Sequence, residues 1–312
     1  MQTSNNFSRA KTSFRHLTMV LLLSGSLACV ATATEGGASV YPVGAETVMP
    51  GMTPAPGASL LAEFSEFYQA NGLADGQGHN LIPGFHLRVA AVALKFTHNW
   101  GVHVFGGTLV SYAALPLLYV HVTAPFGKGD KTGFGNPIIE PLGVAYERGP
   151  WHWWYGYDFF TPGFSYNKNA LVNVGQHNYA MAPAGAFTYM PRKSTEISSK
   201  FQYIMNGENS QMQYRSGNEL VWEYDGMQNI TKRIAVGFNG YYYQQTTNDT
   251  QFGMIVGDGN RGRNLAIGPQ IRAHVGHFLL ISKYTRDTLV QNRPIGNAFW
   301  FEFGLPIGHG HE

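Results

Sequence analysis

The side chains that could do chemistry recur at every second position of short segments. Between Glu196 and Gln202, for example, charged and polar residues hold the even positions, and Ile197 and Phe201 hold odd ones. A period of two places each set on its own side of a β-strand. The pattern predicts a sheet with one polar face, whose candidates are Asp158, Glu196, Lys200, Gln202, Glu219, Glu223, Asn239, Gln270, Arg272 and Lys283, with the aromatic residues Trp154, Tyr241 and Tyr243.

Two interpretations of this polar face remain open. Its residues can pair with one another to satisfy a polar interior, without contact to any solute. Alternatively, the mixed charges and inward aromatic rings form a path for small, weakly polar organic molecules. Tyr and Trp suit that role because they stack on a ring while keeping a polar group.

Other possible centres lack the spacing that their chemistry needs. The sequence contains neither an H-E-x-x-H zinc motif nor a G-x-S-x-G nucleophile motif. His309 and His311 could chelate a metal, but two histidines at a chain end are typically solvated. We therefore predict no catalytic residue, no metal site and no cofactor.

An enzymatic barrel of the lipase or deacylase kind is the alternative from a different class. It would need Ser198 or Ser282 to be brought to His274 or His277 by folding, and nothing in the sequence requires that arrangement. A structural or adhesive barrel is a third alternative. We favour a protein that is not an enzyme.

The composition fits a chain with one face in lipid. Charged residues make up 13%, about half of the roughly 25% usual for soluble domains. Hydrophobic residues stand at an ordinary 44%, and Gly, Tyr and Phe are abundant. The net charge of +2 is too small to indicate nucleic acid as a partner.

The first 33 residues resemble a secretory signal. Three basic residues precede an apolar run of about 14 residues, and Ala31-Thr32-Ala33 offers a cleavage site. The run is shorter than the ~20 residues of a spanning helix, so we expect cleavage and not an anchor. Cys29, which matches a lipoprotein box only faintly, would be removed, leaving a mature chain without disulfides.

The rest of the chain divides into three parts. Residues 34–56 are rich in Gly, Ala and Pro, which predicts an extended arm. This arm is either a periplasmic leader, which we favour, or a plug inside a barrel. Residues 57–307 carry the strand pattern, and 308–312 form a flexible tail.

We predict an all-β, antiparallel transmembrane β-barrel of about 12 strands. The strands lie near 58–69, 84–97, 107–123, 137–148, 151–162, 178–190, 194–206, 217–226, 232–244, 263–274, 277–286 and 297–307. Their connections alternate between long and short throughout, ending on a long one over 287–296. This is typical of barrels with long extracellular loops and tight periplasmic turns. Interfacial aromatic girdles are predicted from Trp100, Trp151, Trp154, Tyr241, Tyr242, Tyr243 and Trp300.

Several short motifs carry a family resemblance. They are Thr161-Pro162-Gly163, Asn173-Val174-Gly175-Gln176-His177-Asn178-Tyr179, Ala186-Phe187-Thr188-Tyr189, Gly133-Phe134-Gly135-Asn136-Pro137-Ile138 and Gly296-Asn297-Ala298-Phe299-Trp300. Over roughly Gly57 to Ile307 the chain resembles the outer-membrane "meta-pathway of phenol degradation" family. Two departures stand out, because Asn136-Pro137 replaces an acidic residue of the family pattern and the chain does not end on an aromatic residue.

The resemblance implies a channel or transporter in the outer membrane of a bacterium, for small hydrophobic or aromatic compounds. It lends no site residue. The expected partners are outer-membrane lipid, a small-molecule solute and the barrel-assembly machinery.

Overall fold

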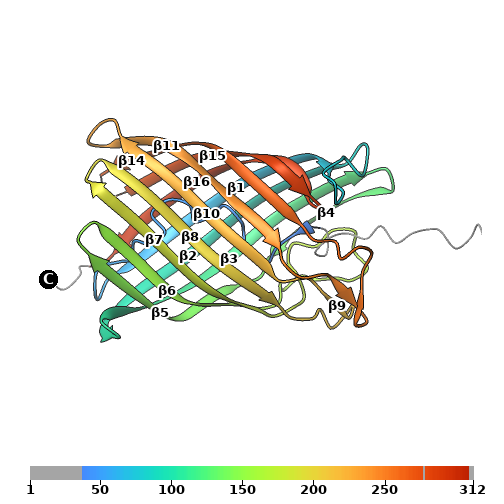
Figure 1. The fold of residues 1–312 in the computed structure, drawn as a ribbon, viewed down its shortest axis with the longest axis horizontal. Helices are drawn as coiled ribbons and strands as arrows, with labels where there is room; N and C mark the ends of the chain where they lie inside the picture. The colour runs from blue at the N-terminus through green and yellow to red at the C-terminus, as the bar shows by residue number, and fades with distance from the viewer. Residues whose placement is uncertain (1–36, 277, 309–312) are drawn as a thin grey trace, which may run out of the picture. The chain divides into compact units, whose positions relative to one another are not determined.

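The computed structural model describes residues 37–276 and 278–308. The signal-like segment and the tail His309–Glu312 lie outside the described residues. Twelve antiparallel strands form the wall (Figure 1): β1 (Ser59–Leu73), β2 (His86–Val104), β3 (Gly107–Ala124), β5 (Ile138–Arg148), β6 (Trp151–Phe160), β7 (Ala180–Arg192), β8 (Thr195–Asn206), β10 (Glu219–Asn229), β11 (Ile234–Gln245), β14 (Arg263–Val275), β15 (Phe278–Gln291) and β16 (Pro294–Ile307).

The sheet closes on itself. Each wall strand pairs with the wall strands that come before and after it in the chain, and β1 pairs both with β2 and with β16, the last strand. Closure leaves no wall strand with an open edge. The predicted all-β, antiparallel barrel is confirmed.

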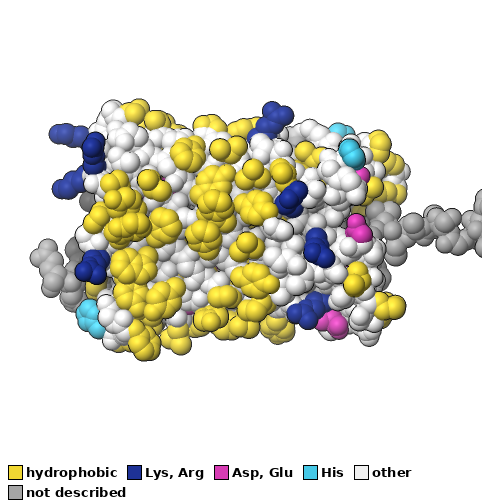
Figure 2. All heavy atoms as spheres, viewed as in Figure 1, with side chains coloured by type: hydrophobic (Ala, Val, Ile, Leu, Met, Phe, Trp, Pro, Cys, Tyr) yellow, Lys and Arg dark blue, Asp and Glu magenta, His cyan; other side chains and the backbone are white. Residues whose placement is uncertain are grey.

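The two faces of the wall differ as the period-2 pattern predicts. In β10 the buried positions hold Glu219, Glu223 and Asp225, while Trp222 between them is 40% exposed. Large apolar residues cover the outward face, and Figure 2 shows them as a belt over its middle, with Lys and Arg nearer the two ends. Polar residues therefore line the inside and apolar residues the outside.

The connections depart from the predicted alternation in two places. The span predicted as a loop after β3 contains β4 (Gly127–Phe134), which pairs with the second half of β3. The last connection is the two-residue turn Asn292-Arg293, because β15 continues along β14 to Gln291. Asn292 adopts φ 49°, the left-handed backbone that such a tight turn uses. The prediction of a long final loop was wrong.

Two long connections also contain short strands that pair with each other. These are β9 (Tyr214–Arg215), β12 (Thr250–Gln251) and β13 (Met254–Ile255), joined in a small sheet of their own. In Figure 1 the β9 label marks this sheet, at the end of the barrel where the long connections lie. It stiffens that end through backbone pairing.

Four residues of the predicted girdles lie inside the barrel. Trp154, Tyr241, Tyr243 and Trp300 are at most 7% exposed. They share the strand face of Asp158, Glu223 and Lys283, and a strand cannot turn a single side chain to the other face without a bulge. The girdle assignment was wrong for these four, whereas Trp100 and Trp151 are 54% and 43% exposed.

The long connection 161–179 folds against the inside of the wall. Its Val172 and Val174 pack on Val120, with Leu118 and Val89 beside them. These contacts make an apolar lining at the end of the barrel that carries the long connections. The described part of the chain contains no helix with the length and apolarity needed to cross a membrane.

Candidate functional site

The Gly- and Pro-rich arm lies inside the barrel. Ser39 donates a hydrogen bond to Glu219 (2.5 Å), at the start of β10, where the long connections lie. At the other end of the segment, the Gly57 nitrogen donates to the Asn99 carbonyl oxygen (2.9 Å), immediately before β1. Residues 37–57, which we call the arm, therefore run the length of the lumen from the long-connection end to the short-turn end.

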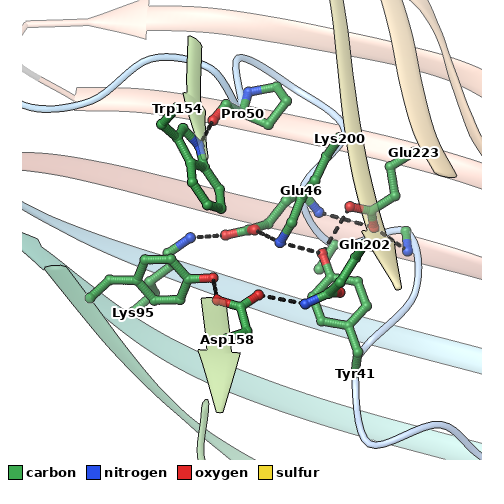
Figure 3. Close-up of polar contacts among 12 residues, drawn as sticks. Tyr41, Glu46, Pro50, Lys95, Trp154, Asp158, Lys200, Gln202 and Glu223 are labelled. Carbon is green, nitrogen blue, oxygen red and sulfur yellow. Dashed lines mark hydrogen bonds and ion pairs between the residues drawn. The ribbon is translucent and has the colours of Figure 1, made fainter. Parts of the chain in front are cut away.

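Glu46 is the central anchor of the arm. Its carboxylate forms ion pairs with Lys95 of β2 and Lys200 of β8 (Figure 3). Burial alone would raise the pKa of Glu46, but Lys200 and Lys95 outweigh burial and lower it to about 2. The arm thus enters the lumen with its one charged residue held between two wall cations.

Glu223 of β10 accepts donors from the arm itself. Its carboxylate receives the Tyr41 hydroxyl (2.8 Å) and the backbone nitrogens of Gly44 (2.6 Å) and Glu46 (3.4 Å). A buried carboxylate is costly unless donors surround it. The arm supplies those donors at this position.

Lys283 of β15 contacts the arm from the other side. Its ammonium donates to the carbonyl oxygens of Gly44 and Ala45 (both 2.8 Å) and to the Thr47 hydroxyl (3.1 Å). It also forms an ion pair with Glu302 of β16. Together with Glu223, it holds both the N–H and the C=O groups of one short stretch of arm.

The next part of the arm lies close against β6 to β8. The Met49 nitrogen donates to Glu196 (3.0 Å), and the Trp154 indole donates to the Pro50 carbonyl oxygen (2.6 Å). Gly51 approaches the wall so closely that a Cβ there would lie 2.3 Å from the Thr188 nitrogen. Only glycine fits this point of contact.

The connection 161–179 also contacts the arm. Asn136 donates to the carbonyl oxygens of Thr161 (2.9 Å) and Gln176 (3.0 Å) and accepts from the Gln176 nitrogen (2.8 Å). Gln176 in turn donates to the Ala38 carbonyl oxygen (3.1 Å). A motif of the connection is thereby linked to the first described residues of the arm.

Residues 70–303 match the family described as "Putative MetA-pathway of phenol degradation". The chain belongs to this family. Its fold is similar to the crystal structure of the COG4313 outer membrane channel from Pseudomonas putida F1, with a TM-score of 0.73 and 15% sequence identity. That alignment covers 83% of this chain and 100% of the other.

A more distant likeness is to a FadL homologue from Pseudomonas aeruginosa, with a TM-score of 0.39 and 11% identity. It covers 88% of this chain and 98% of that one. No curated protein matches the sequence. The family membership and the shared fold agree with the expected type of barrel, that of bacterial outer-membrane proteins.

The predicted wall residues of this family member are all buried, at 7% exposure or less. Six of them contact the arm directly through polar groups. The six are Trp154, Glu196, Lys200, Glu219, Glu223 and Lys283. Whether any of them contacts a solute stays a prediction.

The remaining candidates contact other wall groups. Asp158 accepts from Gln202 (2.5 Å) and from Tyr112, and Arg272 forms an ion pair with Glu196. Asn239 donates to backbone carbonyl oxygens of Gly268 (3.2 Å) and Pro269 (3.2 Å). Tyr241 donates to Asp287 (3.0 Å). These residues make their hydrogen bonds and ion pairs with other groups of the barrel interior.

Sequence reasoning missed several lumen residues. Lys95 and Tyr112 stand where the inward positions of β2 and β3 are mostly Ala, Leu or Val, so no polar alternation marks them. Glu140 lies at an irregularity of β5 beside Pro141, which breaks the period of two. Glu46 had one available signal, since it is the single charged residue in residues 37–57.

Groups of three or more metal-binding side chains are not found among the described residues. The described residues of the lumen contact one another through buried ion pairs, hydrogen bonds and aromatic rings.

Proposed function

We propose that this protein is a channel of the bacterial outer membrane for small hydrophobic or aromatic organic compounds, and that the arm regulates its opening. The observation that carries the proposal is an arm without regular secondary structure that fills the lumen through contacts to wall side chains. The apolar outer face would contact outer-membrane lipid, and the barrel-assembly machinery would insert the chain.

The inner wall offers surfaces that suit such compounds. Val120, Val172 and Val174 form an apolar lining near the long connections. Deeper in the lumen, Tyr112 and Trp154 stand edge to face, with ring centroids 6.0 Å apart. The ring of an aromatic solute could pack against these two rings in an edge-to-face or offset-stacked arrangement.

The composition of the arm suits a movable element. Residues 37–57 contain four Pro and four Gly, and apart from the backbone hydrogen bond of Gly57 to Asn99 they pair with no strand of the sheet. Their hydrogen bonds go mainly to side chains of the wall, so the arm can leave without unfolding a helix or a sheet. A displaced arm would open the space between the aromatic residues.

Uptake by a deletion strain tests this function. Cells that lack the gene and cells with a plasmid copy are compared for initial uptake of labelled aromatic compounds and of alkanes. Restoration by the plasmid copy, together with solute-dependent flux in liposomes that hold the purified protein, is the expected result. Equal uptake in both strains and no flux in liposomes would refute the channel and favour a structural barrel.

The enzymatic alternative has its own measurement. Purified protein is incubated with lipid analogues that release a chromophore on hydrolysis. The expected rate equals that of the detergent blank. Turnover that is lost in Ser198→Ala or Ser282→Ala would instead support a lipase-like barrel.

A further inference from the structure

The inner wall carries many more carboxylates than cations. Buried carboxylates on the strands are Glu140, Asp158, Glu196, Glu219, Glu223, Asp225, Asp287 and Glu302, whereas the buried cations are Lys200, Arg272 and Lys283. The half-buried charged groups of the described residues are balanced, with four of each sign: Glu46, Glu63, Glu66 and Asp75 against Lys95, Lys131, Arg263 and Arg293. The imbalance is specific to the interior, because the whole chain has a net charge of +2.

Ion pairing leaves most of these carboxylates without a cation. Each buried cation has one carboxylate partner, respectively Glu46, Glu196 and Glu302. The other six wall carboxylates have neutral hydrogen-bond donors as their partners among the described residues. Asp287, for example, accepts from Tyr68 (2.9 Å), Tyr241 (3.0 Å) and Asn264 (2.9 Å). Mutual ion pairing therefore does not account for the set.

Glu140 provides a separate indication that the lumen lacks donors. It is 1% exposed, and its Oε2 atom has no hydrogen-bond partner among the described residues. Its Oε1 atom accepts only a long bond from the Leu142 nitrogen (3.2 Å). A buried carboxylate oxygen without a hydrogen-bond partner is stabilised by any donor or cation that reaches it.

The arm does not correct the imbalance. Its one charged residue is Glu46, which adds another carboxylate to the lumen. What the arm contributes to Glu223, Glu196 and Glu219 is neutral donors, namely backbone N–H groups and hydroxyls. When the arm moves and water enters, these carboxylates lose their donors and face the path.

We propose that the lumen favours neutral and cationic organic solutes and rejects anionic ones. This inference rests on the proposed channel function and names the charge class of its solutes. A wall with one excess sign and low-dielectric surroundings concentrates counter-ions, on the order of tenfold or more. An aromatic amine would therefore pass, whereas an aromatic carboxylate or sulfonate of the same size would be held back.

The test is ion selectivity in planar bilayers. Purified full-length mature protein and its Gly51→Ala variant, in which we expect the arm to be displaced, are placed in a KCl gradient, and the reversal potential is measured. We expect K⁺ to be about tenfold more permeant than Cl⁻. The double variant Glu223→Gln, Asp225→Asn should lower the ratio, and Glu147→Gln, whose side chain is 73% exposed, should leave it unchanged.

A solute pair extends the test. Flux of phenyltrimethylammonium and of benzenesulfonate, which keep their charge at all working pH values, is compared in liposomes. Faster flux of the cation supports the proposal. Equal flux or a Cl⁻ preference in a conducting protein overturns the inference alone, whereas no conductance and no flux in either protein refutes the channel function itself.

Discussion

Glu46 and Lys200 form an ion pair inside the lumen, although 154 positions separate them in the chain. Lys95 binds the other oxygen of the same carboxylate. One arm residue thereby joins β2 and β8, which lie on separate parts of the wall. The ion pairs hold the arm in place and also connect the wall across the lumen.

Removal of the Glu46 charge should loosen the arm. In Glu46→Gln, Lys95 and Lys200 keep their charges but lose the carboxylate between them, which costs about 3–5 kcal/mol for buried pairs. We expect a higher open fraction in single-channel recordings than in the native protein. Glu147→Gln is the matched control, and an unchanged open fraction in Glu46→Gln would contradict the role of this residue.

Acid should loosen the arm in the same way. In the docked arm, Lys200 and Lys95 hold the pKa of Glu46 at about 2, below its ordinary value of 4.5. A lowered pKa stabilises the docked arm fully above pH 4.5, and this stabilisation, roughly 3 kcal/mol, is lost as the pH falls toward 2. The open fraction should therefore rise between pH 5 and pH 3.

The Glu46→Gln variant isolates this residue from other titrating groups. Because Gln does not titrate, its open fraction should be high already at pH 7 and should rise less on acidification. A native-like rise in the variant would assign the pH response to wall carboxylates.

Gly51→Ala should displace the arm without altering the wall sequence. The new Cβ would meet the Thr188 nitrogen at 2.3 Å and the His152 carbonyl oxygen at 2.5 Å, both backbone atoms that cannot turn aside. Conductance should increase while the folded barrel keeps its heat-modifiable mobility on gels. Gly76→Ala is the control, because its nearest neighbour lies 3.4 Å away, and conductance equal to the native protein in Gly51→Ala would disprove close docking.

Lys283→Met should expose the arm to reagents. The substitution removes the three hydrogen bonds to residues 44–47 and leaves Glu302 without its cation. With a cysteine placed at Ala45 in the predicted cysteine-free mature chain, thiol labelling should become at least about tenfold faster, since 1.4 kcal/mol already corresponds to a factor of ten. Equal labelling rates in Ala45→Cys with and without Lys283→Met would show that the Lys283 contacts contribute little to docking of the arm.

Gly296→Val should impair closure of the barrel. At this position of β16, a Cβ would lie 2.3 Å from the Gln69 carbonyl oxygen of β1, at the seam where the first and last strands meet. The expected result is a loss of heat-modifiable, folded protein in membranes. Gly304→Val on the same strand is the control, since its nearest neighbours are side-chain atoms at 3.6 Å and beyond.

The wall could be predicted from the sequence because a strand has only two faces. Trp153 and Trp154 are adjacent and identical in type, yet parity alone assigns Trp154 to the interior, where it is 6% exposed. The sequence pattern did not identify Glu140, because an irregularity in β5 shifts the register there. The period of two predicts which face a side chain takes only where the strand pairs with its neighbours without a bulge.

The position of the arm could not be read from its residues. A segment of Gly, Ala and Pro has no period, and the contacts that hold it come from strands as far as 239 positions away. Its place depends on tertiary pairing of Glu46, Gly44 and Gly51 with the wall. Composition indicated only an extended chain, and it left leader and plug as alternatives.

The arm also bears on the seam of the barrel. It ends at Gly57, just before β1, and β1 forms the seam with β16, the last strand of the chain. The contacts of the arm reach β8, β10 and β15, strands with which β1 does not pair. Docking of the arm therefore ties the first strand of the seam to more distant parts of the wall, in addition to the backbone pairing that closes the barrel.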